Sequence, residues 1–97
     1  MKSAPVRREE LLQNLVEARQ KARVSRARVA RWAGLSRMTI SRIESGQQPP
    51  TPHALRAYAQ TCALDTNQLL LSWGIVPEEV LLRLQQNPHL VAIILSS

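Results

Sequence analysis

The fold is decided by residues 28–46, RVARWAGLSRMTISRIESG. Gly34 can end a helix because glycine takes a positive φ without strain, and Ser36 can cap the next helix. With Ser25 as an earlier cap, the stretch predicts two short helices, about 26–33 and 37–44, joined by a tight turn. A short helix backed by another helix has the shape that fits the DNA major groove.

The rest of the chain predicts more helices and no strand. Apolar residues at spacings of three and four, with caps or Pro at helix starts, set the expected ranges at about 6–23, 52–62, 66–72 and 77–86. Asp65 and Thr66 are alternative starts for the third of these. The last apolar run, 89–95, fits a helix or a strand, and its Asn-Pro start favours a helix. We therefore expect an all-α chain.

The expected helix 37–44 has two different faces. At 100° per residue, Ile40, Ile43 and Glu44 share one arc with Ser36, and this arc is expected to face the core. The opposite arc is polar and cationic, and it consists of Arg37, Met38, Ser41, Arg42 and Ser45. Such side chains can bind base edges or phosphates, but an outer face of this kind is also common on soluble proteins.

The positive charge of the chain is concentrated in its first half. The net charge is +6; residues 1–46 carry eleven Lys or Arg against four Glu, whereas residues 47–97 carry two Arg against three acids. This split is typical of a protein that binds a polyanion, with a solvated basic surface as the alternative. The single Cys excludes an internal disulfide, and no apolar run reaches the roughly 20 residues that span a membrane. We therefore expect a cytoplasmic protein.

The segment from about Leu12 to Leu71 resembles the phage-repressor-like (Cro/XRE-type) helix-turn-helix DNA-binding family. The residues that carry the resemblance are Arg19, Ser25-Arg26, Ala30, Gly34-Leu35-Ser36, Ile40-Ser41-Arg42-Ile43-Glu44, Gly46, Pro50-Thr51, Leu55, Ala59 and Leu69. The resemblance implies a five-helix, lambda-repressor-like DNA-binding domain. We assign this domain to residues 1–74 and a short helical extension to residues 75–97.

The resemblance also implies roles for individual residues. The base-reading positions are Arg37, Met38, Ser41 and Arg42. The positions expected to bind DNA phosphates are Arg26, Ser36, Thr39, Gln47 and Gln48. Arg19 and Glu44 match a pair that often forms a salt bridge between the first helix and the recognition helix, in agreement with the inward arc of Glu44. The chain departs from the family at Arg26, where Gln is usual, and at Met38, where a polar residue is usual.

Other kinds of site have little support. His53 and His89 are isolated and expected at the surface, and no catalytic triad order or Gly-rich phosphate loop is present. We therefore expect no enzyme activity, no metal and no cofactor. Cys62 is expected to be a small buried apolar residue. The three aromatic residues, Trp32, Tyr58 and Trp73, are expected at the rim of the core.

The C-terminal segment is more apolar than two short helices can cover by themselves. The residues that we expect to form a homodimer interface are Val80, Leu81, Leu84, Leu90, Val91, Ile93, Ile94 and Leu95. The first three are expected on the inward face of their helix. The alternatives are docking of the tail onto its own domain, binding of another protein, and a remnant of a larger effector domain.

The sequence thus predicts a sequence-specific DNA-binding transcriptional regulator, a bacterial or phage-encoded repressor that binds a palindromic operator as a homodimer. Double-stranded DNA is the expected partner, and no membrane partner is expected. One alternative is an antitoxin that represses its own operon and binds a toxin through the apolar tail. The other is a protein-interaction adaptor that uses the same fold without binding DNA.

Overall fold

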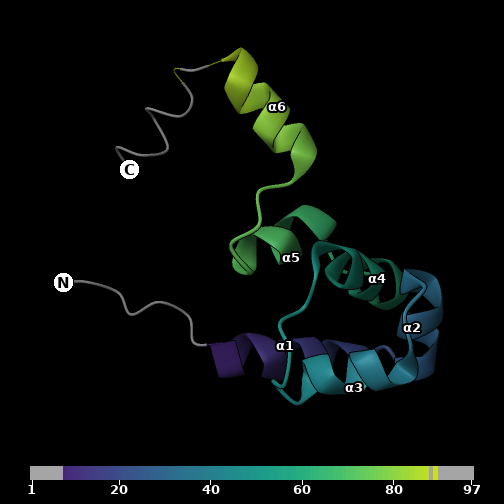
Figure 1. The fold of residues 1–97 in the computed structure, drawn as a ribbon. Helices are drawn as coiled ribbons and strands as arrows, with labels where there is room; N and C mark the ends of the chain where they lie inside the picture. The colour runs from purple at the N-terminus through teal and green to yellow at the C-terminus, as the bar shows by residue number, and fades with distance from the viewer. Residues whose placement is uncertain (1–7, 88, 90–97) are drawn as a thin grey trace.

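The computed structural model describes residues 8–87 and His89. The regular secondary structure of this part of the chain consists of helices joined by turns and loops, without strands (Figure 1). The helices follow in the order α1 Arg8–Lys21, α2 Arg26–Ala33, α3 Arg37–Glu44, α4 Pro52–Cys62, α5 Thr66–Ser72 and α6 Glu78–Gln86. The prediction of an all-α fold is confirmed. The apolar run 89–95 lies outside the described residues, apart from His89.

Polar side chains fix the starts of four helices. Each cap lies one residue before its helix and accepts a hydrogen bond from a backbone N–H near the helix start, which would otherwise have no partner. The caps are Ser25 for α2, Ser36 for α3, Thr51 for α4 and Asp65 for α5. Asp65 is therefore the cap of α5, and the helix itself begins at Thr66. α6 has no side-chain cap and follows Pro77, which is buried.

The turn between α2 and α3 depends on Gly34. Its φ of +66° lies in the left-handed region, where glycine has no Cβ to clash. The N–H of Leu35 donates to the carbonyl of Ala30 at 2.9 Å, which closes the end of α2. α4 ends in the same conformation at Ala63, with φ +57°, although alanine carries a Cβ.

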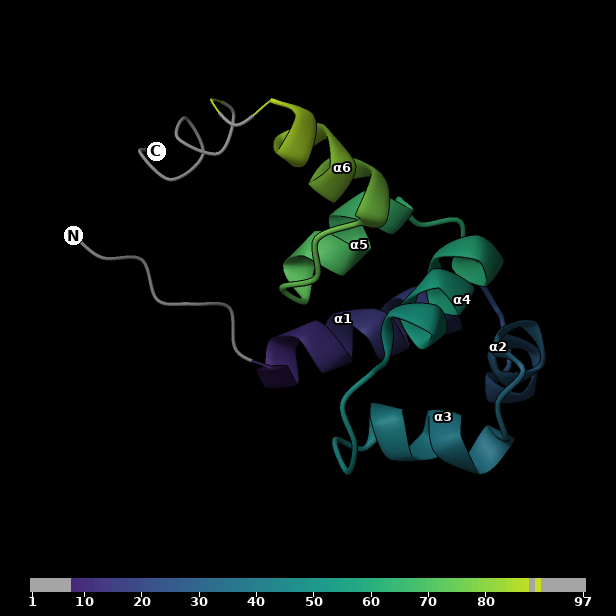
Figure 2. The same ribbon diagram turned by 45° about the horizontal axis from the view of Figure 1, so that its top comes forward.

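The core forms where the first four helices and α5 meet. α2 packs against α3 and α4, α1 packs against α3 and α4, and α5 packs against α4 (Figure 2). The core is mainly aliphatic and consists of Leu15, Val24, Val29, Ala30, Ala33, Ile40, Ile43, Ala54, Leu55, Ala57, Tyr58, Cys62 and Leu70. The prediction that Cys62 is buried is confirmed.

Tyr58 is a correction to the rim prediction. It is fully buried, whereas Trp73 is half-buried and Trp32 is 47% exposed. A tyrosine can be buried completely where its hydroxyl finds a hydrogen-bond partner, and Glu44 supplies that partner.

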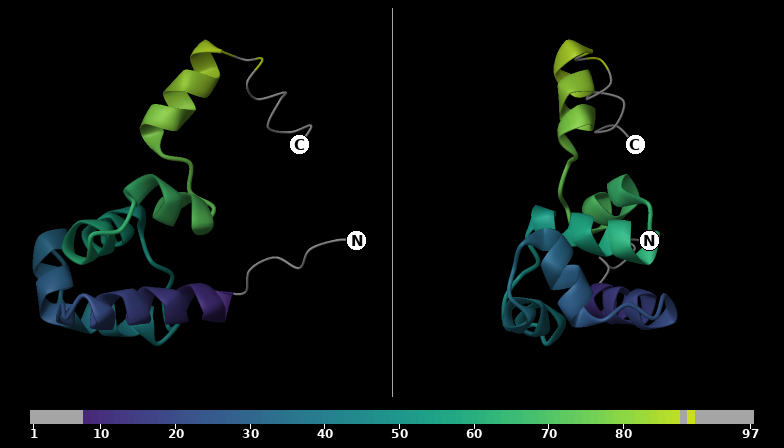
Figure 3. Two further views of the ribbon diagram at one scale, coloured as in Figure 1. Left: turned by 180° about the vertical axis from the view of Figure 1, so that it is seen from behind. Right: turned by 90° about the vertical axis from the view of Figure 1, so that its right-hand side faces the viewer.

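α6 stands apart from the core. Figures 1 and 3 show α6 and α3 at opposite ends of the molecule. No residue of α6 is buried, and Leu81 and Leu82 are 44% and 50% exposed. The prediction of an inward face is therefore wrong for Leu81, while Val80 and Leu84 are half-buried. The further interface candidates, Leu90, Val91, Ile93, Ile94 and Leu95, lie outside the described residues.

Candidate nucleic-acid interface

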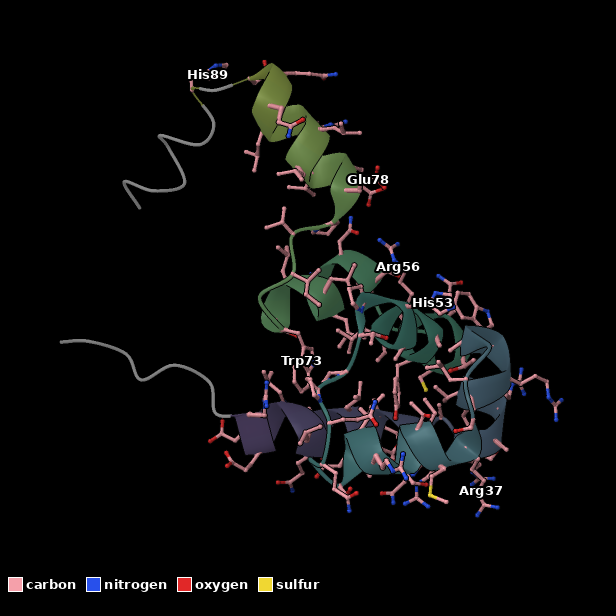
Figure 4. All side chains as sticks on the ribbon, in the orientation of Figure 1. Arg37, His53, Arg56, Trp73, Glu78 and His89 are labelled. Carbon is pink, nitrogen blue, oxygen red and sulfur yellow. The ribbon has the colours of Figure 1, made fainter. Side chains whose placement is uncertain are left out.

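The outer face of α3 carries the residues assigned to base reading. Ile40 and Ile43 are completely buried and attach the helix to the core. Arg37, Met38 and Arg42 are exposed on the other side, and Ser41 is half-buried between the two faces. Figure 4 shows Arg37 on the side of α3 that faces away from α4. α3 thus presents two guanidinium groups and a thioether to solvent from a helix fixed by two β-branched residues.

The residues assigned to phosphate binding lie at the two ends of α3. At its start, the Ser36 hydroxyl accepts a hydrogen bond from the backbone N–H of Thr39 at 3.0 Å and lies 2.8 Å from the Thr39 hydroxyl. At its end, the backbone N–H groups of Gln47 and Gln48 both donate to the carbonyl of Arg42. The amide side chains of this loop are therefore the groups left to bind a phosphate.

Glu44, at the C-terminal end of α3, is the centre of a polar cluster that joins four helices. Arg19 of α1 donates to Glu44 from Nε at 2.7 Å and from Nη2 at 3.0 Å. Arg26 of α2 donates from Nε at 2.9 Å, and the Tyr58 hydroxyl of α4 donates at 2.6 Å. Each carboxylate oxygen therefore accepts two hydrogen bonds. We call Arg19, Arg26, Glu44 and Tyr58 the Glu44 cluster.

Most of the Glu44 cluster is withdrawn from water. The side chains of Arg19 and Glu44 are 9% and 4% exposed, whereas that of Arg26 is 43% exposed. Arg19 also donates from Nη1 to the carbonyl of Val24 at 2.9 Å, which ties it to the turn between α1 and α2. Buried charges are tolerated only when they are paired and hydrogen-bonded, and both conditions are met here.

The ionisation of the cluster follows from this geometry. Burial is the largest influence on the pKa of Glu44 and raises it. Hydrogen bonds from Arg19, Tyr58 and Arg26, with the charge of Arg19, outweigh burial and hold the pKa below its ordinary value. Burial, followed by the hydrogen bond to the Glu44 carboxylate, raises the pKa of Tyr58. The hydrogen bond to Glu44 likewise raises the pKa of Arg19. The carboxylate, the guanidinium and the neutral phenol stabilise one another.

Arg26 contacts a partner that the sequence did not indicate. Its Nε is held by Glu44, while nearly half of its side chain remains exposed. A phosphate would therefore be bound by the nitrogen atoms of the Arg26 guanidinium that do not donate to Glu44. Tyr58 was also missed as a partner of Glu44. It follows Leu55 by three residues and precedes Cys62 by four, a spacing that places it on the inward face of α4.

The other arginines in the described part of the first half of the chain, Arg8 to Arg42, form no ion pair with an acidic residue. Within residues 8–87, the ion pairs are those that Arg19 and Arg26 form with Glu44. Arg37 and Arg42 therefore keep their charge available to a ligand. In the same residues, no group of three or more His, Cys, Asp or Glu is placed to hold a metal ion. None of the described helices has the length and apolarity needed to cross a membrane.

Comparison with protein families matches this chain to a known family of protein domains. A family model described as a helix-turn-helix domain matches residues 10–71, which is more than half of the chain. Comparison with curated proteins and with solved structures gave no match. The matched segment runs from α1 to α5 and includes the turn at Gly34, the outer face of α3 and all of the Glu44 cluster. The chain therefore belongs to the helix-turn-helix domain family.

Proposed function

We propose that this chain is a sequence-specific transcriptional regulator that represses transcription by occupying a palindromic operator as a homodimer. The observation that carries the proposal is the outer face of α3, where Arg37, Met38 and Arg42 are exposed on a helix held by Ile40, Ile43 and Glu44. A duplex that receives α3 in its major groove would meet these side chains first.

Affinity and specificity would come from different residues. Phosphates of either strand would be bound by Arg26 of α2 and by residues at the two ends of α3, namely Ser36, Thr39, Gln47 and Gln48. Such contacts carry no sequence information and weaken steeply as the salt concentration rises. Arg37 and Arg42 each have a planar fork that matches the acceptors of guanine, Ser41 has a hydroxyl, and Met38 can contact a thymine methyl.

Selection of duplexes from a random pool by the full chain tests this proposal. We expect an enriched sequence with two inverted half-sites separated by about one helical turn. Binding of the enriched and a scrambled duplex is then compared over a salt series, and both affinities should fall as salt increases. A chain that enriches no sequence and binds random duplex weakly, without salt dependence, is not a DNA-binding protein, and the adaptor alternative then stands.

The homodimer is proposed to form through α6 and the residues that follow it. Leu81 and Leu82 are exposed on a helix without a buried residue, and Leu71 and Val76 are 50% and 45% exposed nearby in the chain. The exposure of these side chains favours an interface with a second copy over docking of α6 onto its own domain. A two-fold axis running from α3 toward α6 would leave both copies of α3 facing the same side, as a palindromic site requires.

The same exposed leucines favour a second candidate, an antitoxin that binds a toxin through this segment. The two candidates differ in the state of the purified chain. A dimer at micromolar concentration supports the repressor with its own interface. A monomer that binds DNA and becomes dimeric or larger only with a second protein supports the antitoxin.

A further inference from the structure

A second cationic surface lies on α2 and α4, away from the outer face of α3. It consists of Arg28, Arg31, Trp32, His53 and Arg56, all exposed, together with Gln60 and Thr61 of α4. We call these residues the α2–α4 basic surface. Figure 4 shows His53 and Arg56 above α2 and Arg37 at the lower edge of the molecule, below α3.

The geometry of α2 separates this surface from the Glu44 cluster. Arg26 points to Glu44, whereas Arg28, Arg31 and Trp32 lie about 140–240° around the helix from Arg26, given 3.6 residues per turn. A duplex bound along the outer face of α3 therefore leaves these three side chains free.

Trp32 is the centre of the α2–α4 basic surface. The residue is 47% exposed, and the centroid of its ring lies 6.0 Å from that of the His53 ring, at an interplanar angle of 38°. It lines two shallow hollows. The first is shared with Ser25, Arg28, Arg31, Gln60 and Thr61, and the second with Arg56, Gln60, Thr66, Asn67 and Glu79. An exposed indole between two hollows offers an apolar contact with hydrogen-bonding groups on either side.

The charge of this surface is uncompensated. Arg28, Arg31 and Arg56 take part in none of the ion pairs of residues 8–87, all of which involve Glu44. Glu79 shares a hollow with Arg56 but forms no ion pair with it. Arg28 and Arg31 are one turn apart on α2, so their guanidinium groups can reach two carboxylates of one short segment.

We propose that the α2–α4 basic surface binds an acidic peptide segment of another protein, with an apolar side chain of that segment resting on Trp32 between carboxylates bound by Arg28, Arg31 and Arg56. Tryptophan and arginine are the residues that contribute most to protein–protein binding, and complementary charge selects the partner. Such a contact would let the regulator hold a second protein while α3 remains on DNA.

Nucleic acid fits this surface less well. Contacts to duplex phosphates need no exposed indole, and the outer face of α3 already accounts for duplex binding. Single-stranded nucleic acid is bound by several aromatic rings on which successive bases stack, along a positive groove. Trp32 is the only Phe, Tyr or Trp residue on this surface, and its ring already lies beside the ring of His53.

Selection of short peptides from a random displayed library on the immobilised full chain tests the proposal. We expect the recovered peptides to be acidic and to contain at least one apolar residue. Their affinity is measured through the fluorescence of Trp32 in a Trp73→Phe chain, where Trp32 is the sole tryptophan. The Nε1 atom of Trp73 is buried without a hydrogen-bond partner, so this substitution removes no hydrogen bond.

Four variants of the chain locate the binding site. Arg28→Gln with Arg31→Gln should weaken peptide binding roughly tenfold or more, and Trp32→Ala, followed by isothermal calorimetry, should do the same. Arg8→Gln with Arg83→Gln removes the same charge from exposed positions of α1 and α6 and should leave peptide binding unchanged. Arg37→Ala with Arg42→Ala should also leave it unchanged. Circular dichroism checks that each variant is folded.

The outcomes separate this proposal from the proposed function. Loss of duplex binding in Arg37→Ala with Arg42→Ala, together with intact peptide binding, shows two independent surfaces. Peptides without acidic bias, peptides that bind the Arg28/Arg31 variant as well as the parent, or no enrichment at all would overturn the proposal. So would mixed-sequence single-stranded DNA that binds the parent and not the Trp32 variant. The peptide-binding results do not depend on whether α3 reads a duplex.

Discussion

The side chain of Glu44 is buried, and its charge is paired with those of two arginines. Its two oxygens accept hydrogen bonds from Arg19, Arg26 and Tyr58, which come from three other helices. A buried ion pair adds little stability relative to a well-packed apolar core, but removal of one partner leaves an uncompensated buried charge. The cluster therefore affects the free energy of unfolding mainly when one of its members is removed, because a buried charge is then left unpaired.

Glu44→Gln should lower the free energy of unfolding at neutral pH by about 3–5 kcal/mol, because Arg19 stays buried without an anion. The effect should depend on pH. The pKa of folded Glu44 lies below its ordinary value of 4.5, so the stabilisation is fully present above that pH and is lost as pH falls through the folded pKa. Urea unfolding of both chains between pH 7 and 3 measures the difference, which should shrink below about pH 4.5. A difference that does not change with pH would contradict this assignment.

Tyr58→Phe removes one hydrogen bond to a charged acceptor and keeps the buried ring. We expect a loss of about 1.5–3 kcal/mol in the free energy of unfolding. The same substitution should raise the pKa of Glu44, so that acid unfolding begins at a higher pH than in the parent. Thermal unfolding at several pH values tests both effects. A phenylalanine chain as stable as the parent at all pH values would show that the 2.6 Å contact contributes nothing.

Arg42→Ala and Arg26→Ala should differ in how they affect DNA binding. If Arg42 reads a base, its loss weakens binding to the selected duplex by about 1–3 kcal/mol and relaxes the preference at one position. If Arg26 binds a phosphate, its loss weakens binding to all duplexes alike and reduces the salt dependence. Competition binding against selected and scrambled duplexes distinguishes the two. Equal losses on both duplexes for both variants would reject the division of roles.

At the scale of helices, local signals were sufficient to predict most of the fold. Caps at Ser25, Ser36 and Thr51 and the turn at Gly34 act within a few residues, so the helix boundaries follow from the sequence itself. The two faces of α3 follow from its periodicity. The Tyr58–Glu44 contact could not be predicted in this way, because it depends on how α4 is rotated against α3, fourteen residues earlier in the chain.

α6 shows the other limit of sequence reasoning. Its apolar residues indicated an amphipathic helix, but amphipathicity does not reveal what covers the apolar side. The sequence pattern predicts an inward Leu81, yet Leu81 and its neighbour Leu82 are both exposed. Contacts between distant segments or with another molecule decide such positions, and the local pattern contains neither.

Ala63→Gly should stabilise the end of α4. Ala63 has φ +57°, a conformation that is strained for a residue with a Cβ and free of strain for glycine. We expect the free energy of unfolding to rise by about 0.5–1 kcal/mol. Gly34→Ala is the matched control. Its φ is +66° and its added Cβ would meet nothing within 4 Å, so it should be destabilising through backbone strain alone. Urea midpoints of both variants test the pair, and a glycine at 63 that lowers the midpoint would refute the prediction.

At the scale of the molecule, three surfaces lie on different sides of one small core. The outer face of α3 and α6 are at opposite ends, and the α2–α4 basic surface lies between them (Figures 1 and 4). This separation would allow DNA, a second copy of the chain and an acidic segment to bind without displacing one another.

Leu81→Glu with Leu82→Glu should convert the proposed homodimer into a monomer, because charges cannot be buried in an apolar interface without partners. Sedimentation equilibrium measures the change in mass. Gln85→Glu with Gln86→Glu is the control, since it adds the same charge to exposed positions of α6 without removing apolar area. Affinity for a palindromic duplex should fall in the leucine variant, while affinity for a single half-site stays the same. If the unsubstituted chain sediments as a monomer, the proposed homodimer is wrong.

The Glu44 cluster has a consequence for how this domain can be redirected to new targets. Its four positions are interdependent, so a change at one of them lowers the stability of the fold unless the others change with it. Positions 37, 38 and 42, which we propose to read bases, are exposed, and substitutions there should leave the core intact. A library that varies the outer face of α3 while it preserves Arg19, Arg26, Glu44 and Tyr58 should therefore yield mostly folded proteins with altered DNA preferences, whereas the same number of changes spread over α3 should yield mostly unfolded ones.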